Sequence, residues 1–276
     1  MGFLVPIPMN RIENAFSKAK AENRSIFVSY VCAGDPNVEA SLEICRTLIK
    51  SGVDVLEIGV PFSDPLADGL TNQLAAERAL EAGTTGEDVF NLVRFLRKEN
   101  DTAPVVFYTY YNLMFSVGLD AYVAEAKEAG VDGLLVLDLP PEEAGDYMAS
   151  CERCGMKTVF LLAPTTPEER VKYIAQCATG FVYYVSRTGV TGVRDNLASD
   201  LGEMVTMIKR HSDKPLVVGF GIHNRDQVRA VAELADGVVV GSAIVNTIKD
   251  NLGDESAMLN RMGELVTDLV EGTKLG

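Results

Sequence analysis

The stretch from residue 55 to residue 69 contains three carboxylates in a setting that suits chemistry. Glu57 interrupts an apolar, β-forming run that ends at Gly59, and Asp64 and Asp68 lie in the proline-containing loop that follows. An ionised carboxylate inside a buried strand costs free energy unless it has a partner or a task. Carboxylates donate and accept protons in many active sites, so we expect this strand end and its loop to carry the chemistry of the protein.

These acids need a scaffold, and the rest of the chain alternates between strand-like apolar runs and helical patterns. The expected strands are nearly continuous in apolar residues, which is typical of a parallel sheet buried on both faces. They span residues 26–32, 55–59, 104–110, 133–137, 157–162, 181–185, 216–219 and 237–240. A helical pattern follows each strand, and a further helix over residues 10–22 precedes the first strand, where it could plug one end of a barrel.

Eight β–α units in about 250 residues are typical of a parallel sheet that closes into a barrel. We therefore predict an α/β fold, a single (β/α)8 TIM-barrel domain over residues 1–276 with an N-terminal helix and extra short helices. An open, doubly wound sheet is the alternative, although no G-x-G-x-x-G motif follows the first strand. In the predicted barrel, the carboxyl ends of the strands share one mouth, and the acids of residues 55–69 would lie there.

The composition argues against several classes of partner. The 276 residues are 47% hydrophobic and carry a formal net charge of −14, which disfavours nucleic acid and anionic membranes. No apolar run approaches membrane-spanning length, and the short apolar start lacks the basic leader of a secretory signal. Five scattered cysteines are typical of a reduced, cytoplasmic protein. Cys151 and Cys154 have the spacing of two metal ligands, but the sequence has no second pair of this kind, so we expect no metal site.

Glycine-bearing loops follow the last three expected strands. They hold residues 188–192, 219–221 and 241–242. Barrels of this kind often bind phosphate between the last two loops, at the N-terminus of a short helix. Each glycine taken alone could simply allow a tight turn at a strand end. Three glycine-bearing loops in adjacent positions of one barrel, however, favour an anion site.

Aromatic and aliphatic residues occupy strand ends between the acids and the glycines. Together they would enclose a flat, apolar group whose tail is a phosphate, although core packing alone would also place such residues there. They include Tyr30, Tyr110, Leu135, Tyr183 and Phe220.

Several motifs resemble the α subunits of tryptophan synthase, over essentially the whole chain. The matching runs are GDP at 34–36, LEIGVPFSDPLADG at 56–69, Tyr110 with Asn112, DLP at 138–140, SRTGVTG at 186–192, GFGI at 219–222 and GSAIV at 241–245. The resemblance implies a lyase that cleaves indole-3-glycerol phosphate to indole and glyceraldehyde 3-phosphate. It further implies an α2β2 assembly in which a pyridoxal-phosphate β subunit joins the indole to serine, with no cofactor in this chain.

The resemblance also assigns roles to residues. It implies that Glu57 moves protons at carbon 3 of the indole and at the side-chain hydroxyl, and that Asp68 stabilises the positive charge developing at the ring N–H. We expect substrate contacts from Tyr30, Tyr110, Leu135, Tyr183, Thr191 and Phe220. We expect phosphate contacts from Gly192, Gly219, Gly221, Gly241 and Ser242.

The chain departs from the family pattern at four positions. Leu70 stands where Pro is usual, Asn72 where the family has an apolar residue near the indole, Cys32 where Thr is usual and Tyr30 where Phe is common. These differences bear on rate and loop closure more than on the type of reaction. Three alternatives remain: a stand-alone lyase without a partner, another phosphate-handling barrel enzyme such as an isomerase, and a non-catalytic barrel that activates the β subunit.

Overall fold

The computed structural model describes residues 10–186, 194–219 and 221–276. Its strands are all parallel and close into one barrel in sequence order, which confirms the predicted fold. They are β1 (Ile26–Cys32), β2 (Val55–Gly59), β3 (Val105–Thr109), β4 (Gly133–Val136), β5 (Lys157–Leu162), β6 (Val182–Val185), β7 (Leu216–Gly219) and β8 (Gly237–Val240). Because β8 pairs with β1, the open sheet is excluded.

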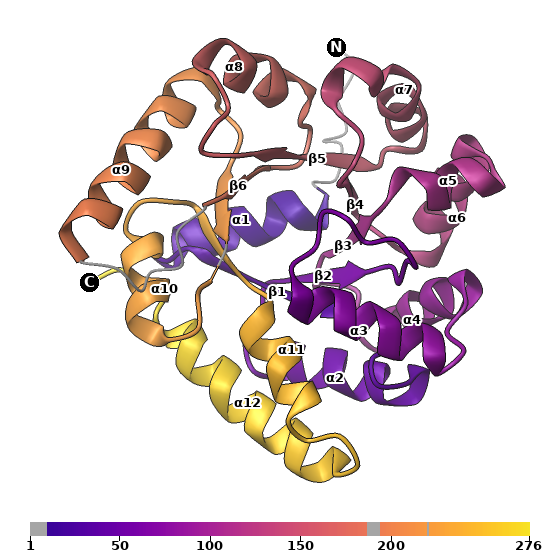
Figure 1. Cartoon of the computed structure of the whole chain (residues 1–276). Helices are drawn as coiled ribbons and strands as arrows, with labels where there is room; N and C mark the ends of the chain where they lie inside the picture. Colours follow the sequence, from indigo (N-terminus) through magenta and orange to yellow (C-terminus); the bar gives the residue numbers. More distant parts are fainter. Residues whose placement is uncertain (1–9, 187–193, 220) are drawn as a thin grey trace, which may run out of the picture.

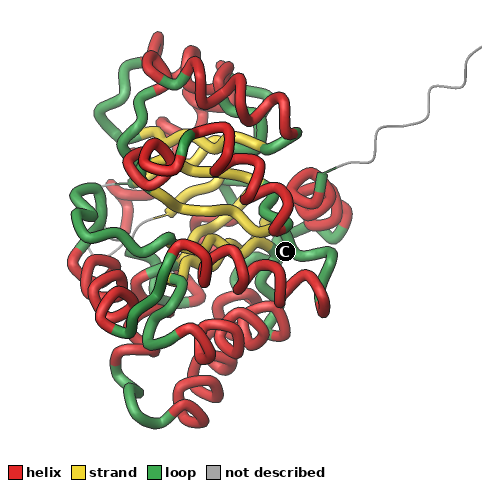
Figure 2. Tube along the Cα trace, turned by 90° about the vertical axis from the view of Figure 1, so that its right-hand side faces the viewer, coloured by secondary structure: helices red, strands yellow, loops and turns green. Residues whose placement is uncertain are grey.

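The helices surround the strands in a ring, except the first, which lies inside that ring at one end of the barrel (Figure 1), and a view turned by 90° shows the strands enclosed by them (Figure 2). They are α1 (Arg11–Ala21), α2 (Val38–Lys50), α3 (Leu70–Glu81), α4 (Gly86–Glu99), α5 (Tyr111–Val117), α6 (Leu119–Ala129), the 3-10 turn η1 (Pro141–Glu143), α7 (Gly145–Cys154), α8 (Glu168–Cys177), α9 (Arg194–His211), α10 (Arg225–Ala232), α11 (Ser242–Lys249) and α12 (Glu255–Glu271). Among the described residues, no helix is long and apolar enough to cross a membrane.

The strands separate two apolar cores, because successive side chains of a strand point to opposite faces. In β2, Leu56 and Ile58 pack outward against the helices, and Val55 packs inside the barrel. Glu57 alternates with Leu56 and Ile58, so its side chain points inward on the same face as Val55. Its neighbours in register are Tyr30 of β1 and Val106 of β3.

Helix α1 closes the amino-terminal end of the barrel. Its Ile12 and Ala19 are buried in the inner core, and Phe16 lies against Phe181 with ring centroids 5.9 Å apart. The side chain of Asn10 caps the helix by accepting the N–H of Ile12 at 2.8 Å. With this end filled by apolar side chains, polar chemistry is left to the opposite, carboxyl end.

Some boundaries differ from the sequence prediction. The sequence pattern predicts a helix from near Gln73, but α3 begins at Leu70, directly after Gly69, which is its N-cap in an extended conformation. Strand β3 ends at Thr109, and Tyr110 is already the N-cap of α5. The sequence pattern predicts one helix over 142–154, and the structure has η1 and α7 in its place.

All five cysteines are free thiols. Cys151 and Cys154 both lie on α7, where Cys151 is buried and Cys154 half-buried. Within the part of the chain that the structure describes, no group of His, Cys, Asp and Glu side chains is arranged to hold a metal ion.

Candidate active site

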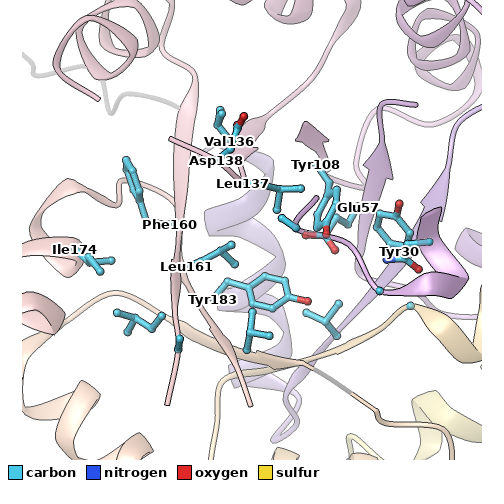
Figure 3. Close-up of a pocket in the computed structure, with 18 of the residues that line it drawn as sticks. Tyr30, Glu57, Tyr108, Val136, Leu137, Asp138, Phe160, Leu161, Ile174 and Tyr183 are labelled. Atoms are coloured by element: carbon cyan, nitrogen blue, oxygen red, sulfur yellow. The ribbon is translucent and has the colours of Figure 1, made fainter. Parts of the chain in front are cut away.

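A cavity of about 570 Å³ opens at the carboxyl ends of the strands. Its wall is mostly aromatic and aliphatic, and Figure 3 shows lining side chains from several strands, from the segment after β4 and from α8. They include Tyr30, Glu57, Tyr108, Leu137, Leu161 and Tyr183. The cavity is large enough for a bicyclic ring with a short tail.

Glu57 is the buried acid of this cavity, whereas Asp138, which also lines it, is exposed. Its side chain is 1% exposed, and its Oε1 atom has no hydrogen-bond partner among the described residues. Burial, with a smaller contribution from the charge of Asp68, raises the pKa of Glu57 from 4.5 to about 8. At neutral pH the carboxyl group therefore keeps its proton and can donate it.

Asp68 lies on the loop between β2 and α3 and is bound by two phenols. Tyr108 donates to its Oδ1 atom and Tyr110 to its Oδ2 atom, each at 2.7 Å. The phenol oxygen of Tyr110 also accepts the backbone N–H of Ala67 at 3.1 Å. Ala67 and Gly69 line the cavity, so Asp68 lies between two lining residues at its edge.

Glycines at the ends of β7 and β8 bring backbone close to the cavity. Gly221, with φ of +68°, lines it together with Gly241 and Ser242, where α11 begins. A helix N-terminus presents backbone N–H groups and a partial positive charge, and both suit an anion. Gly219 lies behind Tyr183: a Cβ atom there would be 2.7 Å from the phenol oxygen.

Of the thirteen predicted site residues, the structure describes ten and brings six of them together. Glu57, Tyr30, Tyr183, Gly221, Gly241 and Ser242 line one cavity. Leu135 does not: it is fully buried in the inner core, and Leu137, one inward-facing position further along the chain, lines the cavity instead. Tyr110 lies outside the lining and binds the loop that carries Asp68. Thr191, Gly192 and Phe220 lie outside the described residues.

Two features escaped the sequence analysis. The first is the hydrogen bond from Tyr108 to Asp68. The second is Arg170 of α8, a cation that lines the cavity and is paired with Glu142 at 2.7 Å. Asn72, which the sequence singled out, lines the cavity with a buried Oδ1 atom that has no partner among the described residues.

The closed barrel and the two acids at its mouth are typical of an enzyme of the (β/α)8-barrel class. A sequence model of the family described as "Tryptophan synthase alpha chain" matches residues 16–274. The chain belongs to the tryptophan synthase alpha chain family. It is a lyase of tryptophan biosynthesis, and the reaction of its family is the cleavage of indole-3-glycerol phosphate.

Relatives and solved structures agree with this assignment. The tryptophan synthase alpha chain of Opitutus terrae is 60% identical over 266 residues, which cover 96% of this chain and all of the relative. That of Geotalea uraniireducens is 45% identical, with 96% and 98% covered. The crystal structure of tryptophan synthase subunit alpha from Legionella pneumophila str. Paris superposes with a TM-score of 0.89 at 38% identity, over 96% of this chain and 99% of that one.

Proposed function

We propose that Glu57 and Asp68 carry out the retro-aldol cleavage of indole-3-glycerol phosphate. Glu57 donates its proton to carbon 3 of the indole, and positive charge develops at the ring nitrogen, where Asp68 accepts the N–H. The bond from carbon 3 to the side chain then breaks, its electrons restore the aromatic ring, and the O–H electrons of the side-chain hydroxyl form the aldehyde. Glu57 takes that hydroxyl proton, so no net proton is consumed.

The observation that carries this assignment is the burial of Glu57, which keeps its carboxyl group protonated at neutral pH. A carboxylic acid with a pKa near the working pH is an effective proton donor and, once deprotonated, an effective acceptor. A carboxylate bound by two phenols suits the second role, because it lies ready to stabilise a cation that develops beside it.

Substrate contacts follow from the cavity walls. Tyr30, Tyr183 and Leu137 would enclose the indole ring, and Leu137 takes the place proposed for Leu135. The phosphate would bind at the start of α11 with Gly241 and Ser242, across from Gly221. Thr191, Gly192 and Phe220 are assigned here by family resemblance, and Gly219 shapes the wall behind Tyr183.

Indole would pass from this chain to a β subunit in an α2β2 assembly, and the pyridoxal phosphate would reside in that partner. Large apolar side chains are exposed on the β2–α3 connection, at the start of α3 and on α5, as a docking surface requires. They are Leu66, Leu70, Phe115 and Val117, which are between 62% and 92% exposed. We place the assembly in the cytoplasm, where the five thiols remain reduced, and treat residues 1–276 as a single domain.

Indole release from indole-3-glycerol phosphate by the purified chain, alone and with a β subunit, tests this proposal. We expect slow release alone and faster release in the complex. Equal rates in both samples would favour a stand-alone lyase. Glu57→Gln separates the remaining alternative: a catalyst loses cleavage, whereas a purely activating barrel would retain all of its effect in the complex.

A further inference from the structure

The loop that carries Asp68 has little to hold it in place by itself. Most of residues 63–70 are exposed. The backbone bonds within the loop are short-range, from Leu66 to the carbonyl of Asp64 and from Asp68 to the carbonyl of Pro65. Contacts from outside the loop must therefore fix the position of the carboxylate.

The side chain of Gln73 in α3 holds the backbone by donating to the carbonyl of Asp68 at 2.8 Å. Tyr108 of β3 and Tyr110 hold the carboxylate. Tyr110 binds the loop twice, through the N–H of Ala67 and through Oδ2 of Asp68. Tyr108 binds the other carboxylate oxygen at 2.7 Å. A carboxylate held at one oxygen can rotate about its terminal torsion, which is broad. A second donor at the other oxygen fixes the plane of the group.

Tyr108 is itself rigidly placed. Its backbone carbonyl accepts the N–H of Val60 at 2.9 Å, and its ring packs edge-on against Tyr30 with centroids 4.9 Å apart. Tyr30 in turn lies against Gly59, where a Cβ atom would be 2.5 Å from the phenol oxygen. Burial raises the pKa of Tyr108 well above its usual value, so its phenol keeps its proton and donates to Asp68.

We propose that Tyr108 is a positioning residue for the cleavage reaction, which acts by fixing the carboxylate plane of Asp68. This inference rests on the proposed role of Asp68 at the ring N–H. A carboxylate offers about four acceptor sites, so two phenols leave lone pairs free for the substrate. The free lone pairs then point in one direction before the substrate arrives, and the cost of orienting the group is removed from the reaction.

The test is Tyr108→Phe, alone and combined with Asp68→Asn. One hydrogen bond to a charged group corresponds to roughly a tenfold change in rate, so we expect kcat to fall about tenfold with KM changed less than twofold. In the Asp68→Asn background, Tyr108→Phe should have no further effect. Tyr111→Phe removes a phenol on the next helix and serves as the control, with kinetics unchanged. Thermal unfolding of each variant confirms that it is folded.

A Tyr108→Phe enzyme that keeps its kcat while Asp68→Asn loses activity would overturn the inference and leave the proposed function intact. Losses that multiply in the double variant would also overturn it, because Tyr108 would then act independently of Asp68. A wild-type chain that releases no indole would overturn both the inference and the proposed function.

Discussion

Replacing Glu57 by glutamine should abolish cleavage and, at the same time, stabilise the fold by an amount that grows with pH. Glu57 is 1% exposed, and the pKa of its carboxyl group is about 8 in place of 4.5. Between those two values the folded protein keeps the proton while the unfolded chain has lost it. The unfolded state then binds fewer protons, so wild-type stability falls as pH rises through this window.

The magnitude follows from the pKa difference. Each pH unit between about 4.5 and 8 lowers the free energy of unfolding by about 1.4 kcal/mol through this one group. Glutamine cannot ionise and is not subject to that loss. The variant should therefore be nearly as stable as wild type at about pH 4.5, more stable by about 3 kcal/mol at about pH 7, and by about 5 kcal/mol above about pH 8.

Urea unfolding of wild type and Glu57→Gln at about pH 5, 7 and 9 measures the difference. Glu128→Gln makes the same chemical change on the exposed face of α6 and corrects for the loss of one carboxylate. A difference that stays constant with pH, or a Gln variant that is less stable than wild type at about pH 9, would refute the reasoning about Glu57.

Four further outcomes are expected. In wild type, kcat/KM should fall as pH rises through about 8, because Glu57 of the free enzyme loses the proton it donates; a steady-state pH profile tests this, and a flat profile would contradict it. Asn72→Ile should raise kcat/KM several-fold, since it removes a buried acceptor with no described partner from the ring pocket; unchanged or lower kcat/KM would count against that account. Ser242→Asp should raise KM for the phosphorylated substrate at least about tenfold by charge repulsion at the helix start, in initial-rate assays; an unaltered KM would remove α11 from the anion site. Gly219→Ala should lower the free energy of unfolding by about 1–3 kcal/mol, because its Cβ would meet Tyr183 at 2.7 Å; wild-type stability in urea would show that this wall yields.

The barrel could be predicted from the sequence because it depends on periodicity, and eight strand–helix units specify closure. The two-residue period of a strand places Glu57 on the same face as Val55, but β2 is apolar on both faces, so only the structure shows that this face points inward. Closure in sequence order makes β1 and β3 the neighbours of β2, whereas the pairing of Glu57 with Tyr30 and Val106 depends on the register that the structure supplies.

Depth along the strands could not be predicted in the same way. Leu135 and Leu137 share the inward face of the same segment, and only the stagger of the strands decides which one reaches the cavity. The structure places Leu137 in the lining and Leu135 in the core below it.

The contacts of Asp68 could not be predicted either, because the sequence of a loop lacks the hydrophobic periodicity that reveals the faces of helices and strands. Nothing in the residue types of 61–69 indicates that Tyr108 and Tyr110 reach the two oxygens of one carboxylate. That arrangement depends on how far the loop folds back over β3, and this is set by the tertiary structure.

The central claim is that Glu57 and Asp68 act on the same indole substrate, and it is tested most directly by kcat for cleavage at saturating indole-3-glycerol phosphate. We expect Glu57→Gln and Asp68→Asn each to lower kcat by roughly 10²- to 10⁴-fold, with the fold of both variants intact. If either variant cleaves at the wild-type rate, the pair does not share the reaction and the account is wrong.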